Sequence, residues 1–91
     1  MKAIVYQGQK QIVYQNVPDP EIQAPTDAIL KIEKTAICGS DLHFYHGPTR
    51  EDLGEFTLGH EFLGTIEEIG TDVRRFKKGD RVLVSCTIGC G

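Results

Sequence analysis

A succession of short β-favouring runs, separated by turn residues, is the feature that most constrains this fold. Residues 2–7 and 11–16 flank the turn Gly8-Gln9-Lys10, which predicts a β-hairpin. Further strands are expected over residues 28–35, 62–70 and 81–85. Such spacing of strands and turns predicts an all-β domain of barrel or sandwich type.

In each expected strand, the alternation of apolar and polar side chains predicts which face is buried. In the strand after Ala28 we expect Leu30 and Ile32 to share one face of a half-buried strand. Gly64 interrupts the run from Phe62 to Gly70, which indicates a bulge or a close backbone approach. In the last strand, Val82, Val84 and Cys86 are expected to face inward.

No long helical period is present, so at most one or two short helical turns are expected. Ser40-Asp41 is a good N-cap pair, and a single turn from Asp41 to Tyr45 would end before Gly47-Pro48. Residues 49–57 are polar and acidic and are expected to form a loop.

Length and composition describe one ordinary globular domain over residues 1–91. The formal charge is −3, and the only local basic cluster is Arg74-Arg75 with Lys77-Lys78, which argues against nucleic-acid binding. The sequence has no secretory signal and no apolar run of membrane-spanning length, so a cytoplasmic protein without a membrane partner is expected. Three cysteines in a reducing compartment favour metal binding or a free thiol over a disulfide framework.

The stretch from Ile37 to Glu61 concentrates the side chains that bind metals. Cys38 and His60 are the natural pair of zinc ligands, because zinc favours thiolate sulfur and imidazole nitrogen. Asp41 would orient His60 through a hydrogen bond, and Glu61 would place a further carboxylate near the metal. The alternative reading is that Cys38 is a buried apolar residue and His60 a structural histidine.

Other metal and nucleotide motifs are absent from the sequence. His60-Glu61 starts like the zinc-protease motif, but Gly64 stands where the second histidine is required. The one G-x-G, Gly89-Cys90-Gly91, has no helix after it and is no dinucleotide fingerprint. Cys86 reads as a structural cysteine, and Cys90 alone does not establish a structural zinc site.

Three ordered motifs nevertheless resemble those of one family. Taken together, they are similar to the amino-terminal part of a zinc-dependent medium-chain alcohol dehydrogenase. The motifs are Cys38-Gly39-Ser40-Asp41-Leu42-His43, Gly59-His60-Glu61-Phe62-Leu63-Gly64 and Lys78-Gly79-Asp80-Arg81-Val82. The resemblance implies a partial GroES-like barrel, followed in such enzymes by a Rossmann NAD(P)-binding domain that these 91 residues do not contain.

The resemblance also implies roles for individual residues. Cys38 and His60 match two of the three catalytic zinc ligands, and Glu61 matches an acidic neighbour that can approach the metal. Asp41 matches the carboxylate partner of the zinc histidine. Ser40 and His43 match a relay that carries the substrate proton away, while Cys90 matches the first of four structural-zinc cysteines.

These roles imply oxidation of an alcohol by hydride transfer to NAD(P), with secondary alcohols, polyols and aldehydes all open as substrates. The 91 residues alone are expected to be inactive, with weak or no zinc at Cys38 and His60, because a ligand and the cofactor domain are missing. Unpaired strand edges would favour self-association or a homo-oligomer. The alternatives are a non-enzymatic GroES-like binding module and a small metal-binding or redox protein using Cys38, Cys86 and Cys90.

Overall fold

The computed structural model describes residues 1–87, which divide into two compact units. The first unit contains residues 1–19 and 36–59. The second contains residues 20–35 and the described residues from His60 onward. Each unit is built around its own three-stranded antiparallel sheet.

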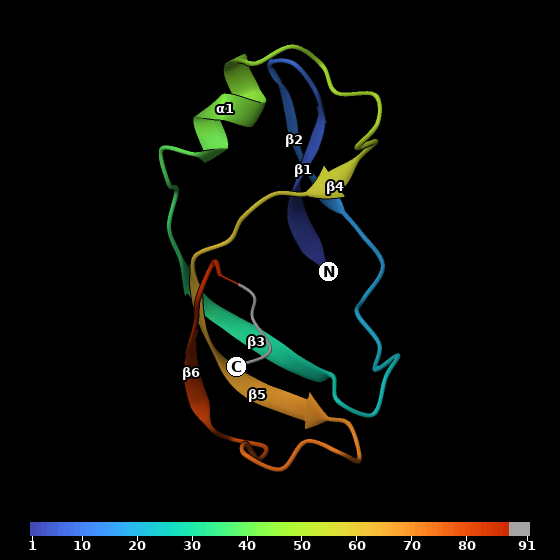
Figure 1. Ribbon diagram of the computed structural model, residues 1–91, viewed down its shortest axis with the longest axis vertical. Helices are drawn as coiled ribbons and strands as arrows, with labels where there is room; N and C mark the ends of the chain where they lie inside the picture. The colour runs from blue at the N-terminus through green and yellow to red at the C-terminus, as the bar shows by residue number, and fades with distance from the viewer. Residues whose placement is uncertain (88–91) are drawn as a thin grey trace. The chain divides into compact units, whose positions relative to one another are not determined.

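The first unit begins with the predicted hairpin. Strands β1 (Lys2–Gly8) and β2 (Gln11–Asn16) pair in antiparallel fashion, and the sheet order is β2-β1-β4. Strand β4 (Phe56–Thr57) lies beside β1 (Figure 1). A continuous loop over residues 49–57 was therefore a wrong expectation, because pairing with Val5 and Tyr6 makes a strand of two residues that carry no strand pattern of their own.

Helix α1 (Asp41–His46) confirms the single helical turn that was predicted before Gly47. It packs on β1 through three aromatic rings. Phe44 stands edge-on to Tyr6 with 6.1 Å between ring centroids, and edge-on to Phe56 at 5.5 Å. Tyr6 and Phe56 are 5.0 Å apart, and Tyr6 is only 1% exposed. This aromatic cluster, Tyr6-Phe44-Phe56, holds the helix in the first unit.

Among the described residues no helix is long and apolar enough to cross a membrane.

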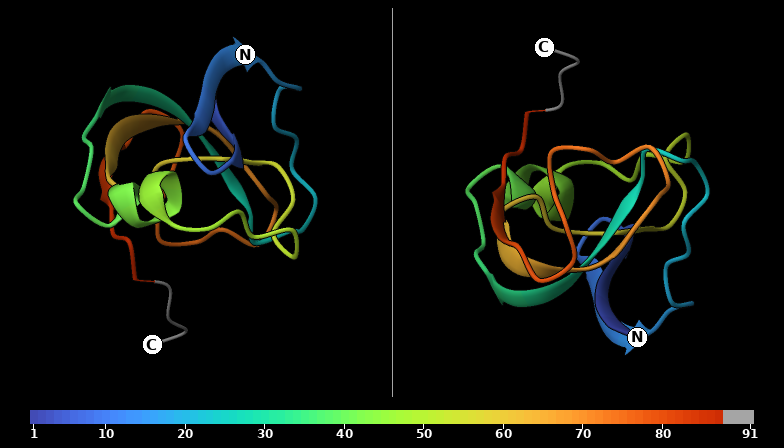
Figure 2. Two further views of the ribbon diagram at one scale, coloured as in Figure 1. Left: turned by 90° about the horizontal axis from the view of Figure 1, so that it is seen from above. Right: turned by 90° about the horizontal axis from the view of Figure 1, so that it is seen from below.

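The second unit contains the remaining strands, β3 (Ala28–Thr35), β5 (Phe62–Ile69) and β6 (Arg81–Val84). Their order is β3-β5-β6, and all neighbours are antiparallel. Both views in Figure 2 show β3 running alongside β5. The strands predicted for these three segments are thus confirmed.

Gly64 marks a close backbone approach, as its position inside a strand pattern indicated. It is buried in β5, opposite Ile32 of β3. A Cβ atom at this position would lie 2.6 Å from the main-chain oxygen of Lys31. Any larger residue would therefore push β3 and β5 apart.

The expected alternation in β3 is only partly present. Ile29 and Leu30 are both half-buried, because the register shifts between them and breaks the two-residue period. Ile32 is 49% exposed, since its partner Gly64 offers no side chain to pack against. The inward orientation expected for Cys86 was also wrong: β6 ends at Val84, so its alternation stops there, and Cys86 is exposed.

A polar network crosses all three strands of the second unit. Glu33 lies where β3 shifts register, between Ile32 and Lys34. Its carboxylate accepts hydrogen bonds from the hydroxyl of Thr65 on β5 and from Arg81 Nε on β6, the latter at 2.9 Å. The Thr65 hydroxyl is the main cause of a lowered Glu33 pKa, and Arg81 lowers it further.

The Glu33→Gln variant should lose stability in a pH-dependent way. Because the folded pKa is lowered, the stabilisation is present above the ordinary glutamate pKa of about 4.3 and is lost as pH falls through the folded value. Urea unfolding at pH 7 should therefore show a small loss of stability, and the difference from the parent chain should shrink towards pH 3. Glu67→Gln, at an exposed position of β5, is the control. A difference that stays constant over this range would contradict the role of the charge.

Loss of the Phe44 ring should undock the helix. For Phe44→Ala we expect a loss of about 3 kcal/mol, the low end of the range for buried phenylalanine, because Phe44 is only half-buried. Phe76, which is 51% exposed, is the control, and Phe76→Ala should cost much less. Urea unfolding followed by circular dichroism measures both. Equal losses for the two variants would exclude a special role for the aromatic cluster.

Candidate metal centre

Cys38, the sulfur ligand expected from the sequence, lies just before the first residue of α1. Cys38 is half-buried in the connection between β3 and the helix. Asp41 Oδ2 accepts a hydrogen bond from the main-chain N–H of Cys38 at 3.0 Å, and the Asp41 N–H donates to the carbonyl oxygen of Cys38, also at 3.0 Å. The side chain of Asp41 is buried, with 7% exposed. These two bonds close a four-residue turn and fix the backbone that carries the thiol.

The two residues expected in the proton relay follow in the same segment. Ser40 is the N-cap of α1, as predicted, but its hydroxyl makes no capping hydrogen bond. The reason is its helical backbone, with φ −65° and ψ −25°, whereas a side chain that caps usually belongs to an extended residue. The main-chain N–H of His43 donates a hydrogen bond to the carbonyl oxygen of Ser40 at 3.2 Å. The two residues are exposed and three positions apart, so they lie on one face of the helix.

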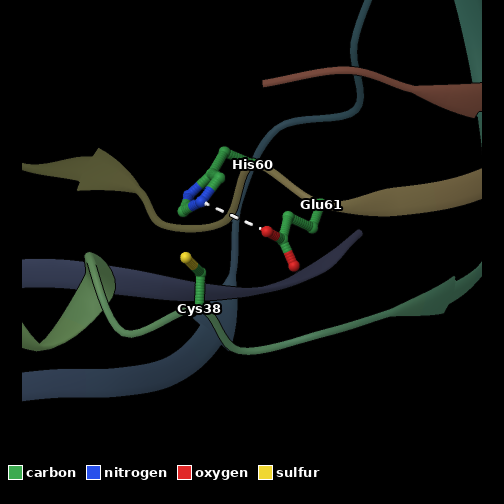
Figure 3. Close-up of side chains that lie close together, drawn as sticks. All are labelled: Cys38, His60 and Glu61. Carbon is green, nitrogen blue, oxygen red and sulfur yellow. Dashed lines mark ion pairs between the residues drawn. The ribbon is translucent and has the colours of Figure 1, made fainter. Parts of the chain in front are cut away.

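In the second unit, His60 and Glu61 come immediately before β5 (Figure 3). The Glu61 carbonyl oxygen accepts a hydrogen bond from Thr35 Oγ1 at 2.9 Å, which ties this segment to the end of β3. His60 Nε2 and Glu61 Oε1 are 3.9 Å apart. This distance is too long for a hydrogen bond, and the pair is ionic only when the imidazole is protonated.

Figure 3 draws three residues whose side chains are of types that bind metal ions: Cys38, His60 and Glu61. Cys38 belongs to the first unit, and His60 and Glu61 belong to the second. A thiolate, an imidazole and a carboxylate are the donors that zinc takes in proteins, so the donor set fits this metal. Cys90, the cysteine matched to a structural zinc site, lies outside the described residues.

Two residues next to the candidate ligands had no role predicted from the sequence. Thr35 holds the Glu61 main chain, but a threonine at a strand end gives no signal of such a contact. Gly59 precedes His60 and has a φ of +125°. The second sequence motif includes this glycine, but the sign of its φ is not readable from the sequence.

Comparison with known proteins places this geometry in a family. Residues 24–91 match the family model of the alcohol dehydrogenase GroES-like domain. An uncharacterized zinc-type alcohol dehydrogenase-like protein, AdhB of Bacillus subtilis (strain 168), is 48% identical over 91 residues, which are 100% of this chain and 24% of that protein.

Solved structures agree with the sequence comparison. Zinc dependent alcohol dehydrogenase 2 from Streptococcus pneumonia, in its apo form, has a TM-score of 0.86 and 42% identity over 100% of this chain and 26% of its own. A putative zinc-binding dehydrogenase from Sinorhizobium meliloti 1021, bound to NADP, has a TM-score of 0.73 and 37% identity over 88% of this chain and 23% of its own.

The chain thus spans about a quarter of the length of these relatives. The match of the family model, over residues 24–91, covers most of the chain. This chain belongs to the alcohol dehydrogenase GroES-like domain family.

Proposed function

We propose that this chain forms the amino-terminal part of the catalytic domain of a zinc- and NAD(P)-dependent alcohol dehydrogenase. Membership of the GroES-like domain family, together with a relative that is zinc-type by name, carries the proposal. The chain spans about a quarter of its relatives, so the Rossmann cofactor domain would lie outside these 91 residues. The 91 residues alone would not turn over substrate.

Cys38 and His60 would be two protein ligands of the catalytic zinc, with Glu61 as a nearby carboxylate. The donor chemistry supports this assignment, and so does the buried carboxylate of Asp41, which holds the Cys38 backbone in place. A catalytic zinc site uses three protein ligands and leaves one position open, so a further ligand would come from elsewhere in the enzyme. Cys90 would belong to a separate structural zinc site.

A bound zinc ion would act as a Lewis acid on the substrate oxygen. The chain's own contribution to the chemistry would be removal of the hydroxyl proton. Ser40 would accept that proton on its hydroxyl oxygen while releasing its own hydroxyl proton towards His43, and the His43 imidazole would pass a proton to solvent. Both residues are exposed and lie on one face of α1, which supports transfer of a proton from Ser40 through His43 to solvent. The substrate would be a small alcohol or aldehyde.

The cofactor would be NAD or NADP, and the NADP-bound relative supports this class. No residue of this chain is assigned to cofactor contact. The compartment would be the cytoplasm, where thiols stay reduced and available to a metal.

Metal titration of the 91-residue chain tests the ligand assignment. Cobalt(II) replaces zinc and gives an absorption band when thiolate binds, so the Cys86→Ser/Cys90→Ser background reports Cys38 alone. We expect weak binding, because the ligand set is incomplete, and a loss of more than about 10-fold in affinity for Cys38→Ser or His60→Ala.

His46→Gln is the matched control for this titration, because His46 is an exposed histidine at the end of α1 that is not assigned to the metal. It should bind cobalt like the background protein. Cobalt–thiolate binding that survives both the Cys38→Ser and the His60→Ala substitution would refute the assignment.

We also propose that the chain self-associates through an exposed sheet edge. Strand β6 is an outer strand of its sheet, and its Leu83 is 80% exposed. Sedimentation should show a mass that rises with concentration, and Leu83→Lys should lower it towards that of the monomer. A concentration-independent monomer for the parent chain would contradict self-association.

A further inference from the structure

Strand β2 lies at an edge of the sheet in the first unit. The order of this sheet is β2-β1-β4, so β1 pairs with one side of β2 and no described strand pairs with the other. Alternate main-chain N–H and C=O groups of a strand point away from its antiparallel partner, and at an edge they can bind another strand. The outer side of β2 is therefore a backbone surface that fits an extended segment.

The six residues of β2, from Gln11 to Asn16, carry no charge. The strand contains neither proline nor glycine, and its centre is Ile-Val-Tyr, three residues that favour β structure. Short uncharged segments of this composition readily pair with copies of themselves. Tyr14 is 68% exposed and its cross-strand neighbour Ile4 is 43% exposed, so apolar surface accompanies the edge.

The other edge strands of the described chain have features that hinder edge-to-edge pairing. Strand β3 carries Lys31, Glu33 and Lys34, and its pairing with β5 shifts register twice. Strand β4 has only two residues. Strand β6 has four residues, including Arg81, and the contact proposed for it depends on the exposed side chain of Leu83. Among the described edge strands, β2 alone combines six residues with the absence of charge.

We propose that the outer edge of β2 binds the β2 strand of a second copy of this chain, in antiparallel pairing about a two-fold axis. Charge favours this partner, because β1, β3, β5 and β6 each contain a charged side chain and β2 contains none. A two-fold contact uses the same surface on both copies and closes at the dimer. The opposite edge of the sheet is the two-residue β4, which offers little backbone for further growth.

This contact is separate from the one proposed for Leu83, because β2 and β6 belong to different sheets. It also does not require that the chain binds zinc. The Leu83→Lys variant, kept under reducing conditions, therefore serves as the background in which the β2 contact is measured.

Sedimentation of this background should show a mass that rises with concentration to twice that of the monomer and no further. Tyr14→Lys should weaken the association by about 10-fold, because both strands of the contact bring the new charge. Two controls should stay within about 3-fold of the background. Tyr14→Phe keeps the ring, and Leu53→Lys adds the same charge at a residue that is 40% exposed in the loop before β4.

Amide hydrogen exchange shows whether β2 itself makes the contact. Residues 11–16 should exchange more slowly as the protein concentration rises, because their outward N–H groups become hydrogen-bonded. Residues 49–55 should exchange at an unchanged rate. Equal protection of both segments, or of neither, would contradict pairing through β2.

The outcomes separate this contact from that of Leu83. If the parent chain associates and the Leu83→Lys variant remains a monomer at all concentrations, the β2 contact is overturned and the Leu83 contact stands. Growth beyond the dimer, or association of Tyr14→Lys as tight as that of the background, also overturns the inference. Should Tyr14→Lys not fold by circular dichroism, Gln11→Lys at an exposed polar position of β2 replaces it, and unchanged association in that variant overturns the inference.

Discussion

Packing of three aromatic rings is the interaction on which the first unit depends. Tyr6 comes from β1, Phe44 from α1 and Phe56 from β4, so one contact set joins three segments that are far apart in the sequence. The helix has only six residues and needs such packing to persist. Because Cys38, Ser40, Asp41 and His43 all belong to the helix or the turn before it, the cluster also fixes the chemistry-bearing segment.

Asp41 has one observed role and one proposed role. The resemblance to alcohol dehydrogenases assigns it to the zinc histidine, and the structure adds a hydrogen bond from its Oδ2 to the Cys38 N–H. It is the buried charged residue of the described chain. Burying a carboxylate is costly unless its oxygens are hydrogen-bonded, so the turn from Cys38 to Asp41 makes that burial tolerable.

Much of the fold could be predicted because its signals are local. The hairpin, the helical turn at Asp41 and the strand after Glu61 follow from turn residues and from side-chain alternation. Strand β4 could not be predicted, because its two residues become a strand only by pairing with β1. The exposure of Ile32 escaped for a similar reason: it depends on the identity of Gly64 across the sheet.

In the candidate site, too, local features could be predicted from the sequence, whereas contacts between distant residues could not. The residue types and their order predict the candidate ligands, because thiol, imidazole and carboxylate are the side-chain groups that zinc binds. The support for those ligands was not visible in the sequence. The hydrogen bond from Thr35 to Glu61 and the backbone angle at Gly59 are properties of the folded chain, and neither leaves a pattern in a single sequence.

The six-residue length of α1 has a consequence for the order of events during synthesis. A helix this short is not stable in isolation, and one of its aromatic partners, Phe56, is translated ten residues after the helix ends at His46. We therefore expect the turn that carries Cys38 to become ordered only after Phe56 has been synthesised and can pack against Phe44.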